Sequence, residues 1–237
     1  MRYIFRALSS LLFPALCRHC QTAIDAETPF LCTHCMSHLE LIHPATRCPR
    51  CFSDEIVHNK KRCFTCFEKR EKQTIDYVAS CFDYMGPIET VVQEFKYNDS
   101  PYLAKSLGAF LFLQFTALQW PKPDYITFIP HTVLRKIKRG YNQSELLAKE
   151  LSKYLERPVV PFLKKEGAHL QQTKLERKGR EELRSTLFSS KLGTTIEDKV
   201  ILLIDDVLTT GTTLMRAGEI LQSGYPKRLY ALTLCRS

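Results

Sequence analysis

The sequence has no apolar run long enough to cross a lipid bilayer. Its most membrane-like stretch, residues 7–16, is shorter than the roughly 20 residues that a spanning helix needs. A small residue just before Cys17, which a lipoprotein signal would require, is also lacking, because Leu16 stands there. We interpret the stretch as an amphipathic lead-in to the segment that follows, and we expect a protein that does not span the membrane.

Acidic residues are in short supply relative to basic ones. The 25 Asp and Glu residues face 34 Lys and Arg residues, which gives a formal charge of +9. A basic balance permits contact with nucleic acid or another polyanion without proving it. A helix-turn-helix pattern is absent, which argues against a transcriptional regulator. The 237 residues, 44% apolar and 25% charged, suffice for one large or two smaller globular domains.

Cysteines, by contrast, are abundant and regularly spaced. Eight of the ten fall in Cys-x-x-Cys pairs, and the arrangement over residues 17–35 recurs 31 positions later. The two sets are Cys17, Cys20, Cys32 and Cys35, followed by Cys48, Cys51, Cys63 and Cys66. Paired knuckles at this spacing typically form tetrahedral thiolate cages for Zn²⁺, as in zinc ribbons. We therefore predict two structural zinc ions and a reducing cytoplasm.

We expect these ribbons to form a module over residues 1–72 with a core of its own. Zinc should supply its folding free energy, because segments this short bury little apolar surface. Sequential use of each repeat is our preferred pairing, although a cross-braced arrangement is also compatible with the spacing. The second ribbon carries Lys60, Lys61 and Arg62 among Phe52, Phe64 and Phe67. These residues fit a surface for single-stranded nucleic acid and a solvated face about equally well.

Residues 73–237 alternate between strand-like and helix-like patterns. Apolar strand patterns occupy residues 75–82, 124–129, 159–163, 200–204 and 229–234, the last of which should close the sheet. Helical patterns occupy residues 88–95, 102–118, 144–155 and 214–221. This alternation predicts an α/β domain with a mostly parallel sheet. Residues 164–187 are polar and charged and predict a long functional loop.

The most informative stretch of this domain is residues 200–213. Five apolar residues, 200–204, predict a strand buried on both faces, and Asp205 and Asp206 follow, in our interpretation just past the strand end. The next residues are small and polar and lead into a helix N-terminus, which favours a phosphate. Carboxylates accept hydrogen bonds from sugar hydroxyls, so the stretch fits a ribose 5-phosphate. It resembles the phosphoribosyl pyrophosphate (PRPP) signature of type I phosphoribosyltransferases.

Several motifs together extend this resemblance over nearly the whole chain. They are the apolar residues 11–14 that run into Cys17, the Arg-Gly-Tyr-Asn-Gln stretch of residues 139–143, the loop residues Gln172, Leu175, Arg180 and Phe188, the acidic stretch 204–213, and the closing residues 234–236. The set resembles the ComF/GntX family of phosphoribosyltransferase-like proteins with an N-terminal zinc ribbon. The resemblance implies a type I phosphoribosyltransferase fold, and handling of single-stranded DNA during natural transformation.

The resemblance also implies roles for individual residues. The ligand would be PRPP with Mg²⁺, and the binding segment would comprise Asp205, Asp206, Val207, Leu208, Thr209, Thr210, Gly211, Thr212 and Thr213. The stretch that should face the site comprises Arg139, Gly140, Tyr141, Asn142 and Gln143. Catalysis would fall to Asp205, Asp206, Arg139 and Arg180. Besides residues 60–62, the cations Arg135, Lys136 and Lys138 are candidates for contact with nucleic acid.

Two departures from the family pattern bear on turnover. His131 and Thr132 stand where a leucine and a histidine are expected, and Leu183 replaces an asparagine. We therefore favour a protein that binds a phosphoribosyl ligand and handles single-stranded DNA together with uptake helicase or channel proteins at the inner face of the membrane. The alternatives are an active phosphoribosyltransferase acting on an unknown base or amine and, less favoured, a regulatory PRPP sensor.

Overall fold

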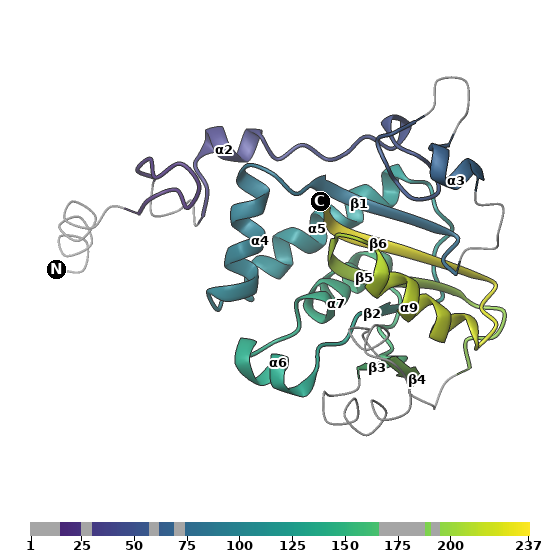
Figure 1. Cartoon of the computed structure of the whole chain (residues 1–237). Helices are drawn as coiled ribbons and strands as arrows, with labels where there is room; N and C mark the ends of the chain where they lie inside the picture. Colours follow the sequence, from purple (N-terminus) through teal and green to yellow (C-terminus); the bar gives the residue numbers. More distant parts are fainter. Residues whose placement is uncertain (1–14, 25–29, 57–61, 69–73, 166–187, 191–194) are drawn as a thin grey trace, which may run out of the picture.

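The computed structural model describes residues 15–24, 30–56, 62–68, 74–165, 188–190 and 195–237 of the chain. Its centre is a four-stranded sheet in the order β1-β6-β5-β2, with all strands parallel. The strands are β1 (Tyr77–Asp83), β6 (Arg228–Arg236), β5 (Val200–Leu208) and β2 (Tyr125–Phe128). The predicted α/β architecture with a mostly parallel sheet is confirmed, and Figure 1 shows the arrangement.

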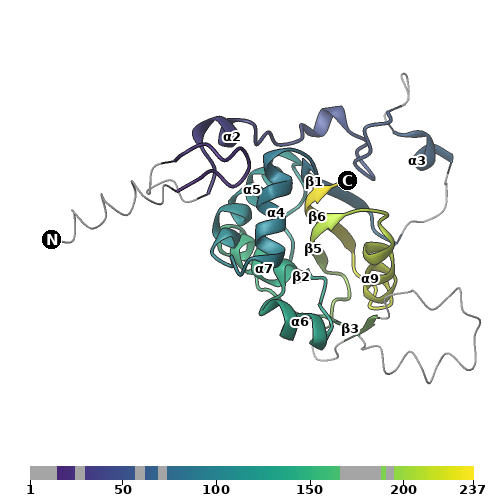
Figure 2. The same ribbon diagram turned by 60° about the vertical axis from the view of Figure 1, so that its left-hand side comes forward.

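Helices cover both faces of this sheet. On one face lie α4 (Pro87–Tyr97), α5 (Leu103–Ala117) and α7 (Gln143–Leu155), and on the other lies α9 (Thr212–Gln222), as Figure 2 shows. Strand β5 contributes side chains to the cores on both faces of the sheet, because successive side chains of a strand point to opposite faces. Leu202 and Ile204 join the core under the first layer, whereas Ile201 and Leu203 join the core under α9. This double burial is the reason for the unbroken apolar run.

Two of the predicted strands differ from the structure. Residues 159–163 do not form a continuous strand: Val159 makes one parallel bridge to Ile126, and β3 (Leu163–Lys165) pairs instead with β4 (Phe188–Ser190) in a separate antiparallel sheet. The prediction that residues 229–234 close the sheet is also wrong. They belong to β6, which lies between β1 and β5 and is buried along most of its length.

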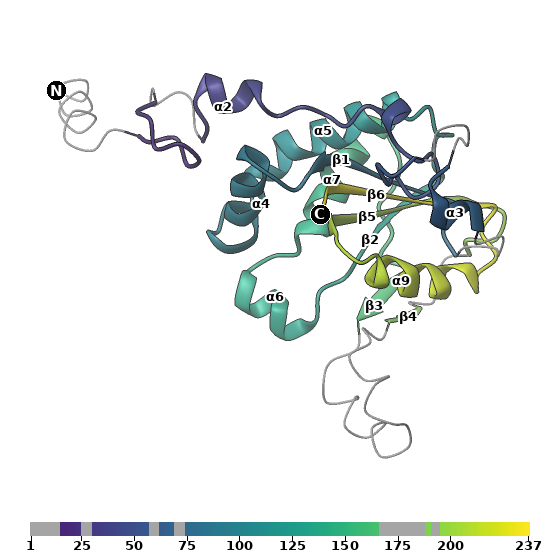
Figure 3. The same ribbon diagram turned by 45° about the horizontal axis from the view of Figure 1, so that its top comes forward.

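The carboxyl ends of the strands point toward the last turn of α4 and toward a short helix, α6 (Val133–Arg139). Figure 3 shows α6 projecting beside this edge of the sheet. The Thr132 side chain caps α6 by accepting a hydrogen bond from the backbone N–H of Arg135 at 3.3 Å. Thr132, one of the two departures from the family pattern, therefore has a local structural role.

The N-terminal region packs along the exposed edge of β1. It contains α2 (Thr33–Ser37), the 3-10 helix η1 (Pro44–Thr46) and α3 (Phe64–Glu68). The Ile42 N–H donates to the Cys81 carbonyl at 2.8 Å, and the Val78 N–H donates to the Arg50 carbonyl at 2.8 Å. The linker between the cysteine repeats and the start of the second repeat therefore cover backbone groups that would otherwise be left on an open sheet edge.

The expectation of two separate cores is wrong. Phe30, Leu31 and Ile42 are buried in one continuous cluster with residues of the sheet, α4, α5 and α7. The side-chain amide of Gln114 on α5 also donates to the Ile42 carbonyl at 2.9 Å. A boundary between residues 72 and 73 stays a prediction, since residues 69–73 lie outside the described part of the chain. Within the described residues, no helix has the length and apolar character needed to cross a membrane.

Candidate functional site

The acidic pair lies inside strand β5, not past its end. The strand continues to Leu208, and Asp205 pairs in register with Thr233 of the central strand β6. The interpretation that the pair lies just past the strand end is therefore wrong, and Asp205 is only 8% exposed. The strand extends further than its apolar run because β6 continues alongside it and supplies backbone partners.

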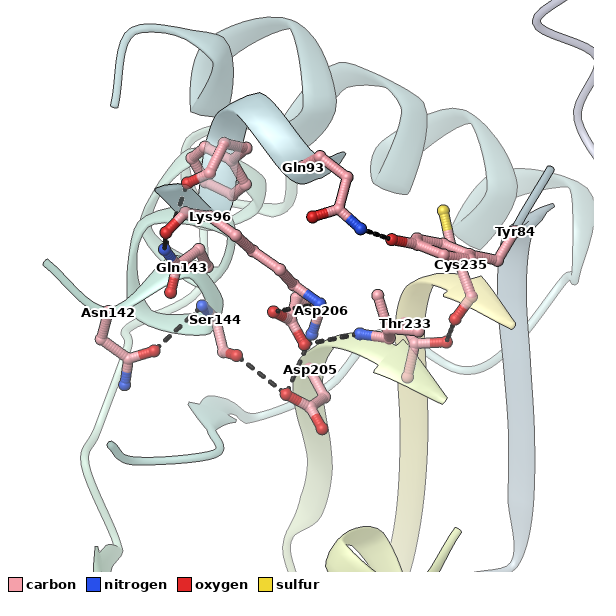
Figure 4. Close-up of polar contacts among 12 residues, drawn as sticks. Tyr84, Gln93, Lys96, Asn142, Gln143, Ser144, Asp205, Asp206, Thr233 and Cys235 are labelled. Atoms are coloured by element: carbon pink, nitrogen blue, oxygen red, sulfur yellow. Dashed lines mark hydrogen bonds and ion pairs between the residues drawn. The ribbon is translucent and has the colours of Figure 1, made fainter. Parts of the chain in front are cut away.

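Each carboxylate is held by its own donors, as Figure 4 shows. The Ser144 hydroxyl and the Asp206 backbone N–H both donate to Oδ1 of Asp205, each at 2.9 Å. Oδ1 of Asp206 accepts from the Val207 N–H at 2.7 Å, and its Oδ2 lies 3.2 Å from Nζ of Lys96. The two carboxylates therefore have different environments, because Asp205 contacts a side-chain hydroxyl and Asp206 contacts a cation.

Burial dominates the electrostatics of the pair. Desolvation and then the adjacent Asp206 charge raise the pKa of Asp205 from its ordinary 3.8 to about 7, although Ser144, the Asp206 N–H and Lys96 act in the opposite direction. A carboxyl that changes charge near neutral pH is a frequent property of ligand sites.

The loop after β5 has the geometry expected of a phosphate cradle. Gly211 has a φ of 77°, in the left-handed region that favours glycine, and it is the N-cap of α9. The hydroxyls of Thr210 and Thr212 lie 3.0 Å apart, and both residues are exposed. The N-terminus of α9 thus lies next to exposed hydroxyl groups, and the Thr212 N–H donates to the Thr210 hydroxyl at 3.5 Å. A helix N-terminus beside hydroxyls suits an anion.

The stretch of residues 139–143 is more structural than predicted. Asn142 and Gln143 are buried, and their amides donate to backbone carbonyls, at 3.0 Å to Ile129 and at 3.1 Å to Phe95. The prediction that the whole stretch faces the site is therefore wrong for these two residues. They connect α7 to β2 and α4, and this places Ser144, the next residue, against Asp205.

Basic side chains approach the acidic pair from other elements. His131 follows β2, and its Nδ1 is buried without a hydrogen-bond partner. Burial and then Arg135 lower the pKa of His131 to about 4, so the imidazole is neutral at physiological pH. Burial and the charge of Arg135 also lower the pKa of Lys165 in β3, whereas Asp205 raises it. The Arg139 guanidinium lies 4.7 Å from the ring centroid of Tyr97.

Other predicted residues fall outside the described part of the chain. They are Lys60, Lys61, Arg180 and Leu183, together with the side chain of Lys138. Arg62, Arg135 and Lys136 are exposed, as are Phe64 and Phe67, whereas Phe52 is buried in the core.

Two residues of the site carry no recognisable signal in the sequence. Lys96 ends a helical pattern and resembles any surface lysine, although its side chain is only 16% exposed. Ser144 directly follows the Arg-Gly-Tyr-Asn-Gln stretch, and this position was the one indication of its role. Both reach the acidic pair through helix packing, which local sequence does not report.

The eight predicted cysteines form two groups in the sequential pairing. One group contains Cys17, Cys20, Cys32 and Cys35, and the other contains Cys48, Cys51, Cys63 and Cys66. Within each group the ligand atoms all lie within 4.8 Å of one another. The cross-braced alternative is therefore excluded. The first group lies next to α4, since His19 Nδ1 is 3.0 Å from the Thr90 hydroxyl.

The geometry of both groups fits a tetrahedral zinc ion. Four sulfurs at about 2.3 Å from Zn²⁺ would lie about 3.8 Å apart. The Cys20–Cys32 and Cys51–Cys63 sulfur distances are 3.6 Å and 3.4 Å. Backbone N–H groups also point at ligand sulfurs, from Cys35 to Cys32 at 3.4 Å. Bound zinc would hold these loops closed and stabilise the packing of the N-terminal region on the sheet.

We predict that metal analysis of the purified protein finds about two zinc ions per chain. Cys32→Ser should lose one of them and lower the melting temperature of the whole protein, because the first ribbon shares its core with the sheet. His38→Ala, at an exposed histidine near the same group, is the control and should keep both ions. Folded protein without zinc would contradict the prediction.

We also predict a characteristic pH dependence for Asp205→Asn. Since the folded pKa is above the ordinary one, ionising Asp205 costs stability as pH rises from about 4 to about 7. The variant lacks this cost, so its advantage in unfolding free energy over the wild type should grow by about 2 kcal/mol between about pH 5.5 and pH 8. Denaturant titrations at several pH values measure this difference. Asp198→Asn, at an exposed residue, is the control, and an equal difference at all pH values would refute the raised pKa.

Comparisons with known proteins agree with this geometry. A family model described as "Phosphoribosyl transferase domain" matches residues 141–237. Competence protein F of Haemophilus influenzae is 29% identical over 145 residues, which is 59% of this chain and 63% of that protein. DNA utilization protein YhgH of Escherichia coli is 25% identical over 65% of this chain and 70% of its own length. Competence protein ComFC of Bacillus subtilis is 27% identical over 67% of this chain and 63% of its own length.

Among solved structures, the chain is similar to the glutamine PRPP amidotransferase from B. subtilis, with a TM-score of 0.43 and 19% identity over 60% of this chain and 30% of that one. An adenine phosphoribosyltransferase has a TM-score of 0.39 and 18% identity over 60% of this chain and 74% of that one. The chain spans just under two thirds of the length of the Haemophilus and Bacillus relatives. On its domain match and its named relatives, the chain is similar to phosphoribosyltransferase-like proteins of the ComF family.

Proposed function

We propose that the protein binds PRPP or a related phosphoribosyl ligand at the carboxyl ends of its parallel strands. One observation carries this proposal: β5 brings Asp205 and Asp206 directly to a glycine-turned loop at the N-terminus of α9. In this proposal the carboxylates accept hydrogen bonds from the ribose hydroxyls. The donors of residues 209–213, with Val207 and Leu208 leading into them, hold the 5-phosphate.

The cations around the acidic pair support the same ligand. Pyrophosphate would be accompanied by Mg²⁺, which neutralises part of its charge. Arg135, Arg139 and Lys165 all lie near enough to His131 for their charges to lower its pKa, and Lys165 also lies within the influence of the Asp205 charge. Neutral His131 can donate a hydrogen bond there without adding charge.

Binding is better supported than turnover. Phosphoribosyl transfer needs cations that close over the departing pyrophosphate and a defined place for the acceptor. Arg180, the predicted loop cation, lies outside the described residues. An active phosphoribosyltransferase acting on a base or amine is the alternative, and release of labelled pyrophosphate from PRPP would establish it.

We further propose that the protein handles single-stranded DNA in the cytoplasm, at the inner face of the membrane, with uptake helicase or channel proteins as partners. Its relatives' names, competence protein and DNA utilization protein, support this role. A specific surface supports it as well. Helix α6 exposes Leu134 and Ile137, at 71% and 75%, beside the exposed cations Arg135 and Lys136.

The α6 surface continues onto the end of α4. Tyr97 is 63% exposed and carries the Arg139 guanidinium on its ring, and Tyr102 nearby in sequence is 59% exposed. Figures 1 and 3 both show α6 beside this end of α4. Aromatic rings and arginine planes stack on nucleobases of any sequence, while exposed cations contact phosphates. This combination suits a single strand better than a duplex.

One prediction of this proposal concerns the binding of PRPP. Asp205→Asn combined with Asp206→Asn should weaken PRPP binding by about 3 kcal/mol or more, roughly a hundredfold, because amides lose the charge-assisted bonds to sugar hydroxyls. Calorimetric titration with Mg²⁺ measures the affinity, and a thermal melt verifies folding. Wild-type affinity in the folded double variant would show that the acidic pair serves the fold alone.

Gly211→Val tests the phosphate half of the site. A branched side chain at a φ of 77° strains the loop and blocks the approach of phosphate to backbone N–H groups. Gly86→Val is the matched control, because Gly86 also has positive φ and open space but lies at the start of α4. PRPP affinity should fall for the first variant and stay unchanged for the second.

A separate prediction concerns the binding of single-stranded DNA. Affinity for a single-stranded oligonucleotide should fall steeply with salt, and Arg135→Glu with Lys136→Glu should weaken it and lower the salt slope by about 2. Lys105→Glu with Lys227→Glu reverses two exposed cations elsewhere and is the control. Fluorescence anisotropy at several salt concentrations measures both. Equal effects of the two double variants would mean that the α6 surface has no special role.

A further inference from the structure

Lys96 reaches the acidic site from outside the domain that the family model matches. That domain begins at residue 141, whereas Lys96 lies in the last turn of α4. Its Nζ is 3.2 Å from Oδ2 of Asp206, and the two side chains are only 16% and 15% exposed. Figure 4 shows the lysine extended from α4 toward the end of β5. The contact is therefore a partly buried ion pair built from two distant parts of the chain.

The turn that carries Lys96 is held in place by residues 141 and 143. The Tyr141 hydroxyl donates to the Phe95 carbonyl at 2.7 Å and accepts from the Ser100 N–H at 3.1 Å. The Gln143 amide donates to the same Phe95 carbonyl at 3.1 Å. These bonds restrict the direction in which the Lys96 side chain projects. The buried part of the Arg-Gly-Tyr-Asn-Gln stretch therefore has a structural role, which is to hold the last turn of α4.

The stability of the fold alone does not explain this ion pair. The cost of desolvation offsets most of the attraction in a buried pair, and apolar residues of similar size often give a protein of equal stability. Two neighbouring carboxylates also resist joint ionisation in a site with little water. An ammonium group on Asp206 reduces that repulsion. It also fixes one oxygen of Asp206 while the Val207 N–H fixes the other.

We propose that Lys96 is a positioning residue of the phosphoribosyl site, which keeps the Asp206 carboxylate oriented for the hydroxyls of a ribose 5-phosphate ligand. This inference rests on the proposed binding of PRPP and adds a residue from α4 to that site. The lysine acts through Asp206, and the ligand it serves is a phosphorylated ribose with free vicinal hydroxyls.

The test is a double-mutant cycle on the full-length protein, with PRPP and ribose 5-phosphate titrated separately. Lys96→Met should weaken both ligands by about tenfold or more, which corresponds to about 1.4 kcal/mol. Lys96→Arg keeps the charge and should retain most of the affinity. In an Asp206→Asn background, Lys96→Met should cause no further loss, because the lysine then has no carboxylate to orient.

The combined Lys96→Met and Asp206→Asn variant also guards against misfolding, since it leaves no unpaired buried charge. Lys105→Met on α5 is the control for removing a lysine and should bind both ligands normally. Unchanged affinity in folded Lys96→Met, or an additional loss in the Asp206→Asn background, would overturn the positioning role. Failure of the wild type to bind PRPP would instead overturn the proposed function, so the two failures are distinguishable.

Discussion

The structure depends on how two adjacent carboxylates are accommodated at the end of a central strand. Asp205 and Asp206 continue β5 after five apolar residues, so one of them is buried beside β6. Ionised carboxylates are costly in such a place unless donors surround them. Ser144 and Lys96 supply a hydroxyl and an ammonium from α7 and α4. The helices on this face therefore complete the site as well as covering the sheet.

The N-terminal region covers the open edge of strand β1. Ile42 in its linker bonds to Cys81, and Arg50 in its second cysteine repeat bonds to Val78. Arg236 at the end of β6 donates to the carbonyls of Cys51 and Phe52 in the same repeat. Arg236 is also in register with Leu208, which immediately precedes the loop that leads into α9. The second cysteine group, the covered edge of β1 and the placement of this loop are thus physically connected through one strand end.

The carboxyl edge of the sheet adjoins two surfaces of different chemistry. Inside it are acidic groups, hydroxyls and free helix N–H groups, which suit a phosphorylated sugar. Outside it, α6 and the end of α4 expose aliphatic, aromatic and basic side chains, which suit unpaired bases and phosphates. The last turn of α4 belongs to both, since Lys96 points inward while Tyr97 lies under Arg139. The proposed phosphoribosyl site and the proposed nucleic-acid surface are accordingly neighbours in this protein.

The sequence by itself determined the features that depend on local pattern. Cysteine spacing predicted both groups of four cysteines, alternation of strands and helices predicted the α/β fold, and residues 200–213 predicted a buried strand followed by a glycine turn into a helix. Only the tertiary structure decided which carboxylate is buried, that the N-terminal region shares the main core, and that Lys96 and Ser144 join the site. The physical reason is that these outcomes depend on contacts between residues far apart in the chain, such as 96 with 206, which periodicity and spacing do not encode.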